Sequence, residues 1–181
     1  MKILEKTLFA GFGGQGILSV GKIFADACVE HVMNASWLPS YGPEMRGGTC
    51  NCLVAASNEQ ILSPYFVRPT NAVIMNEASM ERFLPALDTA RVVVVNSSLV
   101  NLTPEMEETL KNVHLVQVDA TNIAIELGTV KCANMVMLGA YMKSCSVLSV
   151  DDLRVSISKK FTKQNVLDTN MQALARGYEL A

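Results

Sequence analysis

The sequence is poor in charged residues, and its positive and negative charges nearly balance. Charged residues make up 18% of the 181 residues, whereas they account for about 25% of an average globular domain. The formal net charge is −2 at pH 7 and the isoelectric point is near 5.7. We therefore expect no nucleic-acid partner, since a basic surface is missing. With 50% hydrophobic residues, either the core is large or a partner protein covers part of the apolar surface.

Long hydrophobic runs are missing as well. No apolar segment approaches the roughly 20 residues that cross a bilayer. Near the N-terminus, Glu5 and Lys6 interrupt the only early apolar run, which argues against a signal peptide. We expect a cytoplasmic protein with no membrane partner.

The cysteines lack the spacing of a metal or redox motif. The five are Cys28, Cys50, Cys52, Cys132 and Cys145, and none forms a Cys-x-x-Cys pair. Cys50 and Cys52 alternate within an expected strand, so their thiols should share one face, but two further soft ligands at suitable spacing are absent. The close cysteine run that binds iron–sulfur clusters is also absent. We expect buried, reduced thiols.

Catalytic side chains are scarce. The two histidines, His31 and His114, belong to no Ser/His/Asp or Cys/His arrangement that the sequence reveals. We therefore expect no catalytic residue and no metal ligand in this chain.

The sequence does contain an alternation of short strands and amphipathic helices. Continuous apolar runs at residues 72–75 and 91–95 are typical of strands buried on both faces of a parallel sheet. The pair Thr103-Pro104 is a helix start signal. These patterns predict one domain over residues 1–181, a three-layer α/β/α Rossmann-like fold with a mostly parallel central sheet. Further strands are expected at 7–10, 35–38, 50–56 and 114–118, and further helices from 17, 134, 149 and near 167.

The stretch from Asn134 to Met142 is apolar on every side. A helix of this kind must be buried all round, which in a small domain favours a subunit interface.

A glycine-rich turn lies between the first expected strand and helix. Its Gly-x-Gly-x-x-Gly spacing matches the dinucleotide fingerprint, in which a tight turn leads to helix N-terminal amides that favour an anion. The acidic residue expected about 20 positions later is missing, and Trp37 would fill the space of a ribose. Gln15 offers an amide to a ligand or partner. The candidate site residues here are Gly11, Gly13, Gly14, Gln15 and Gly16.

The most informative segment is the loop at residues 41–48, Tyr-Gly-Pro-Glu-Met-Arg-Gly-Gly. Its proline lacks a backbone donor and its glycines allow close approach to another molecule, so it suits neither a helix nor a strand. Arg46 is the candidate anion contact, because a guanidinium binds a carboxylate or phosphate in a bidentate way. The alternative is an ion pair between Arg46 and Glu44. The candidate site residues here are Tyr41, Gly42, Glu44, Arg46, Gly47 and Gly48.

The two loops in this order resemble the gamma subunit of 2-oxoacid:ferredoxin oxidoreductases. The segments Trp37-Leu38-Pro39-Ser40 and Ala133–Ala140 are similar to the 2-oxoisovalerate and 2-oxoglutarate members. The resemblance implies a subunit that is inactive alone, in a complex with alpha and beta subunits, with or without a ferredoxin-like delta subunit. It also implies that the complex uses thiamine diphosphate, Mg, iron–sulfur clusters and coenzyme A, and that ferredoxin accepts the electrons.

By this resemblance the complex oxidatively decarboxylates a 2-oxoacid to an acyl-CoA, and this chain binds no cofactor alone. Its two loops would face the shared site, near coenzyme A or a partner subunit. Two alternatives remain. One is the beta-type subunit of indolepyruvate:ferredoxin oxidoreductase, whose second motif differs from Tyr41-Gly42-Pro43-Glu44. The other is a stand-alone dinucleotide-binding module.

Overall fold

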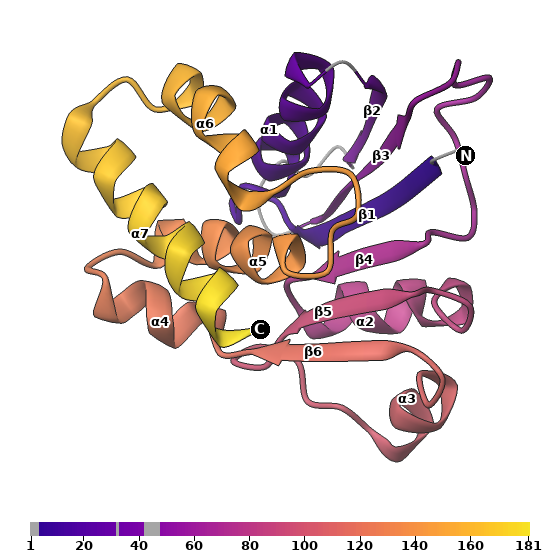
Figure 1. The fold of residues 1–181 in the computed structure, drawn as a ribbon. Helices are drawn as coiled ribbons and strands as arrows, with labels where there is room; N and C mark the ends of the chain where they lie inside the picture. The colour runs from indigo at the N-terminus through magenta and orange to yellow at the C-terminus, as the bar shows by residue number, and fades with distance from the viewer. Residues whose placement is uncertain (1–3, 32, 42–47) are drawn as a thin grey trace.

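The computed structural model describes residues 4–31, 33–41 and 48–181. Six strands form one sheet in the order β2-β3-β1-β4-β5-β6, with helices on both sides (Figure 1). The strands are β1 (Leu4–Phe12), β2 (Asn34–Tyr41), β3 (Thr49–Ser57), β4 (Asn71–Ile74), β5 (Val92–Asn96) and β6 (His114–Val118).

Two helical layers complete the expected three-layer α/β/α fold. On one face of the sheet lie α1 (Ile17–Glu30), α4 (Ala120–Glu126), α5 (Ala133–Met142), α6 (Arg154–Lys160) and α7 (Gln164–Leu180). Of these, α1 and α5 pack on the strands, while α6 and α7 pack mainly on other helices. The other face packs against α2 (Glu77–Phe83), α3 (Pro104–Thr109) and the short 3-10 helix η1 (Leu84–Ala86). Two further 3-10 helices are η2 (Val130–Cys132) and η3 (Val150–Leu153). Among the helices described, none has the length and apolar character that crossing a bilayer requires.

The sheet is mostly parallel, as the apolar runs predicted. β1, β4, β5 and β6 run in the same direction, and every residue of β4 and β5 is buried. The exception is β3, which is antiparallel to both β1 and β2. Because β3 separates them, β2 does not lie beside β1, where a dinucleotide-binding fold places its second strand.

The all-apolar helix α5 is buried by its own chain, so the expectation of a subunit interface for it is wrong. All ten of its residues are buried. Its closest neighbour is α7 (Figure 1), which approaches at two glycines: Gly139 of α5 faces the backbone of Leu174, and Gly177 of α7 faces the backbone of Val136. Missing side chains at these two positions allow the helix backbones to meet.

Local signals in the sequence operate as expected. Thr103 Oγ1 accepts a hydrogen bond from the Met106 N–H at 3.3 Å, with Pro104 in the first helical position. Asp152 Oδ2 accepts from the Ser149 N–H at 2.7 Å. This capping pair begins η3 rather than an α-helix, and α6 follows directly.

The buried cysteines should resist chemical modification. All five are free, and all but the half-buried Cys145 are buried. Burial raises the pKa of Cys28 and Cys52 to about 12 and that of Cys145 to about 11. Because the thiolate is the nucleophile, a thiol of pKa about 12 is ionised in about one molecule in ten thousand near pH 8. We expect a disulfide reagent to leave Cys28 and Cys52 unmodified in the native chain and to modify all five thiols after denaturation. Rapid native-state labelling of Cys28 or Cys52 would contradict this.

Candidate functional site

The two glycine-rich segments meet at one end of the sheet. β1 ends at Phe12, and β3 begins immediately after Gly48. The N–H of Gly13 donates a hydrogen bond to the carbonyl oxygen of Gly48 at 3.0 Å. This bond joins the turn that follows β1 to the end of the 41–48 loop.

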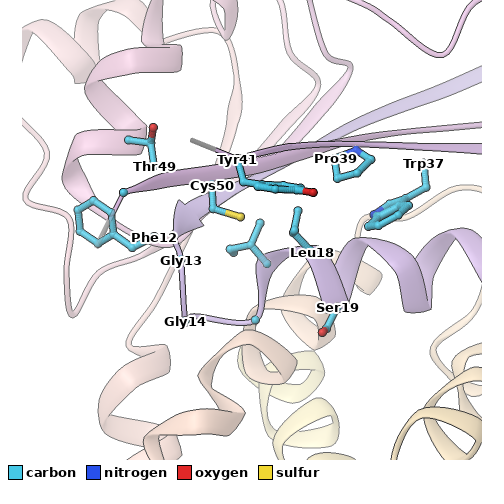
Figure 2. Close-up of a pocket in the computed structure, with 13 residues that line it drawn as sticks. Phe12, Gly13, Gly14, Leu18, Ser19, Trp37, Pro39, Tyr41, Thr49 and Cys50 are labelled. Carbon is cyan, nitrogen blue, oxygen red and sulfur yellow. The ribbon is translucent and has the colours of Figure 1, made fainter. Parts of the chain in front are cut away.

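A pocket of about 620 Å³ opens at this junction. Figure 2 shows it between the N-terminal turn of α1 and the ends of β2 and β3. Five of the expected site residues line it, namely Gly13, Gly14, Gly16, Tyr41 and Gly48. The pocket is also lined by residues outside the two glycine-rich segments, among them Ser19, Pro39, Thr49 and Cys50.

Two glycines of the turn have backbone conformations that other residues rarely adopt. Gly14 has φ 102° and Gly16 has φ 75°, both in the left-handed region that favours glycine. A Cβ at Gly16 would also overlap the amide of Asn134, whose Nδ2 donates to the Gly16 carbonyl at 3.3 Å. The turn therefore depends on glycine at these two positions for its shape.

Gln15 was expected to contact a ligand or partner, but in the structure its side-chain oxygen holds the turn in place. Its Oε1 accepts hydrogen bonds from the Phe12 N–H at 2.7 Å and from Asn76 Nδ2 at 2.9 Å. A Cβ at Gly11 would lie 2.6 Å from the same oxygen. Gln15 and Gly11 thus brace the turn from behind, and neither lines the pocket. The carbonyl oxygen of Gln15 is therefore engaged within the chain, and contact of its amide with a ligand or partner stays a prediction.

The N-terminus of α1 is open toward the pocket. No side chain caps it, and its first turn contains no acidic residue. The N–H groups of Ile17, Leu18 and Ser19 find no acceptor among the described residues, and all three residues line the pocket. Unpaired N–H groups and the positive end of the helix dipole together favour an anion at this position.

The opposite wall is apolar and partly aromatic. Trp37, Pro39 and Tyr41 occupy alternate positions of β2, so their side chains share one face, and Figure 2 shows all three beside Leu18. Trp37 is half-buried and Tyr41 is exposed. The expectation that Trp37 fills the space of a dinucleotide ribose does not apply, because β3 lies between β2 and β1. Trp37 is instead part of the pocket wall.

The remaining candidates cannot be placed. Gly42, Glu44, Arg46 and Gly47 lie outside the described residues, so a contact between Arg46 and an anion stays a prediction. Within the described ranges, no three His, Cys, Asp or Glu side chains stand close enough to hold a metal ion.

The open start of α1 had a signal in the sequence. The helix beginning at Ile17 follows Gly-Gly-Gln-Gly, with no Ser, Thr, Asp or Asn at the position that normally caps a helix. The sequence therefore predicts that the first turn of α1 has no side-chain cap. The contribution of Thr49 and Cys50 was not, because it depends on the pairing of β3 with β1.

The chain matches the model of one protein family along nearly its whole length. The match to pyruvate ferredoxin/flavodoxin oxidoreductase covers residues 6–180.

Relatives of known name agree with this match. Ketoisovalerate oxidoreductase subunit VorA of Methanothermobacter thermautotrophicus is 34% identical over 95% of this chain, and the chain spans 35% of the length of that relative. 2-Oxoglutarate synthase subunit KorC of Methanocaldococcus jannaschii is 28% identical over 100% of this chain and 96% of its own length. Among solved structures, the gamma subunit of keto/oxoacid ferredoxin oxidoreductase from Geobacter sulfurreducens has a TM-score of 0.80 and 25% identity, over 98% of each chain.

Proposed function

The chain belongs to the pyruvate ferredoxin/flavodoxin oxidoreductase family, and we propose that it is the gamma subunit of a 2-oxoacid:ferredoxin oxidoreductase. The complex would oxidatively decarboxylate a 2-oxoacid to an acyl-CoA and pass the electrons to ferredoxin. The observation that carries this proposal is the end-to-end match to KorC, which is a separate subunit of nearly the same length.

The proposed substrate is a branched-chain 2-oxoacid such as 2-oxoisovalerate, with 2-oxoglutarate as the alternative. The names of the two relatives support this pair, and the higher identity to the ketoisovalerate enzyme supports the order. The proposed partners are alpha and beta subunits, with or without a ferredoxin-like delta subunit. Free thiols at all five cysteines fit a reducing compartment such as the cytoplasm.

Thiamine diphosphate, Mg and iron–sulfur clusters are assigned to the partner subunits. The described part of this chain has no group of three metal-ligating side chains, and four of its thiols are buried. The donor set of the described residues therefore does not fit a cluster or a metal-bound cofactor.

For this chain we propose a part in binding coenzyme A. Phosphate groups suit the open N-terminus of α1, where three N–H groups lack an acceptor among the described residues. The apolar wall of Trp37, Pro39 and Tyr41 suits the adenine ring or the pantetheine arm. The pocket volume of about 620 Å³ is within the usual range for small-molecule sites, about 300–1,000 Å³. On sequence grounds, Arg46 would add a cation.

A carboxylate placed at the start of α1 should weaken coenzyme A binding without harming the fold. Ser19 is the third residue of α1 and lines the pocket, and an acidic residue in a first helical turn stabilises the helix. We expect Ser19→Glu to raise the KM for coenzyme A about tenfold or more, which is a loss of about 1.4 kcal/mol, while leaving the KM for the 2-oxoacid unchanged. The matched control is Ser19→Gln, which has the same size without the charge. Equal KM values for coenzyme A in the two variants would contradict the binding of a phosphate group at this position.

The function itself is tested on the assembled complex. The tagged chain is isolated anaerobically with its partners and assayed for coenzyme A-dependent viologen reduction across a panel of 2-oxoacids. Activity highest with branched-chain substrates supports the proposal, and activity highest with indolepyruvate assigns the chain to that branch instead. A chain that is isolated without partners and binds a dinucleotide refutes it.

A further inference from the structure

A second cavity, of about 460 Å³, lies on the opposite face of the sheet. Near this edge α2 contacts β1 and β4, and residues 58–70, which form neither helix nor strand, provide the wall over β2 and β3. The cavity is mainly apolar, and Ser40, Asn51 and Arg82 contribute polar side chains. Its principal lining residues are Leu38, Leu53, Phe66, Phe83, Asn51 and Arg82.

Residues 58–70 are anchored to the rest of the chain. Phe66 is buried, the Thr70 N–H donates to the Lys6 carbonyl at 2.8 Å, and Arg68 Nη1 lies 2.7 Å from Asp88 Oδ1. A segment held at these points has its outward side chains in a defined place.

Three outward side chains of this segment are apolar. Leu62 is 91% exposed, Val67 68% and Tyr65 64%, and the last two also line the cavity. Single exposed apolar residues are common, but a group of three beside a cavity is typical of a protein interface. Leu62 does not line the cavity, so a small ligand inside the cavity would not cover it.

Asn51 provides an unused hydrogen-bonding group inside the cavity. The residue is only 7% exposed and lines the cavity, yet its side-chain amide has no hydrogen-bond partner among the described residues. The amide atoms are not among the fully buried polar atoms that lack a partner, so they are accessible from the cavity. The amide is therefore placed to bind a group that enters from outside.

Arg82 adds a cation to the same wall. It donates to Thr49 Oγ1 at 2.8 Å, and no carboxylate lies within ion-pair distance of it in the part of the chain that the structure describes. Thr49 and Asn51 are alternate residues of β3, so they share one face at a spacing of about 7 Å. An incoming carboxylate could thus meet both the guanidinium and the amide.

We propose that this surface, formed by Leu62, Tyr65, Val67, Asn51 and Arg82, docks a partner subunit of the same oxidoreductase complex. The partner contributes an apolar side chain that fills the cavity and an adjacent Asp or Glu that accepts hydrogen bonds from Arg82 and Asn51. This inference rests on the proposed function, since it needs the complex to exist, but it concerns the face of the sheet opposite the coenzyme A pocket.

The test is assembly of the complex from the full-length chain and the subunits that copurify with it. We expect Leu62→Asp and Arg82→Glu each to weaken partner retention tenfold or more, because one places a charge against an apolar surface and the other repels the partner carboxylate. The matched control is Ile125→Asp on α4, where an equally apolar side chain is 58% exposed at the far end of the molecule (Figure 1). That variant should retain its partners.

Asn51→Val separates docking from folding. Removing an amide that has no partner among the described residues should leave the melting temperature of the isolated chain unchanged or higher, while partner retention falls. Normal retention in the Leu62 and Arg82 variants would overturn the docking surface and leave the proposed function intact. A wild-type chain that retains no partner would overturn both. Self-association of the wild-type chain that Leu62→Asp abolishes would identify a second copy as the occupant and refute a partner subunit.

Discussion

Replacing Gly177 by alanine is expected to lower the free energy of unfolding by about 3 kcal/mol, the upper end of the range for overpacked cores. The same change at an exposed position inside a helix would raise it by about 1 kcal/mol, because alanine is the better helix former. The sign reverses here because a Cβ at Gly177 overlaps the backbone carbonyl of Val136. A backbone atom cannot rotate away, so α7 would have to move off α5.

Chemical unfolding monitored by circular dichroism measures this effect. The neighbouring Arg176 is exposed on the same helix, and Arg176→Ala should change stability by no more than about 0.5 kcal/mol. Gly139→Ala should resemble Gly177→Ala, since its Cβ would meet the backbone of Leu174. Wild-type stability in both glycine variants would show that the two helices do not pack at these positions.

Removal of the Glu5 carboxylate should destabilise the chain by about 3 kcal/mol, the upper end of the cost of leaving buried donors without their acceptor. Glu5 is 3% exposed. It accepts hydrogen bonds from the Tyr141 hydroxyl, from Asn71 Nδ2 at 3.0 Å and from Ser146 Oγ at 2.7 Å, and Arg91 Nη2 lies 3.4 Å away. Glu5→Ala would leave these donors without their acceptor.

Tyr141 explains why this network depends on the carboxylate. Burial, together with the nearby Cys145 and Glu5, raises the pKa of the Tyr141 hydroxyl well above its usual value, so the phenol stays protonated and donates to Glu5. Thr7 Oγ1, 2.9 Å from the same oxygen, must then be the donor of its own bond to Tyr141.

Paired unfolding curves test the role of Glu5. Glu5→Gln keeps the shape and should cost less than Glu5→Ala, because one oxygen can still accept from Tyr141 and Asn71. The surface control is Glu81→Ala, an exposed position on α2. If Glu5→Ala cost no more than this control, the carboxylate would have no structural role.

Features that depend on residues close together in the sequence were predictable from it. The buried valines of β5, the cap at Thr103 and the layer order all follow from periodicity and local chemistry. The reversed direction of β3 was not predictable, because it depends on pairing between residues at least 37 positions apart, beginning with Phe12 and Thr49. Glu5 presented the same difficulty, since its burial depends on Asn71, Arg91, Tyr141 and Ser146.

The candidate site divides in the same way. The glycines that follow β1 predict both the tight turn and the uncapped first turn of α1. The role of Gln15 depends on Asn76, which follows β4, so the sequence suggested an outward amide where the structure has an inward one. Asn51 and Arg82 carried no motif at all, and only the fold brings them to one cavity.

The self-contained burial of α5 has a consequence for how genes of this family are organised. A domain whose central helix is covered by its own α7 does not need a covalent neighbour to complete its core. The same unit can then be encoded as a free polypeptide or joined to other units in one reading frame, without redesign of its interior. Relatives in which it is almost the whole protein and relatives in which it is about a third are the two arrangements that such independence permits.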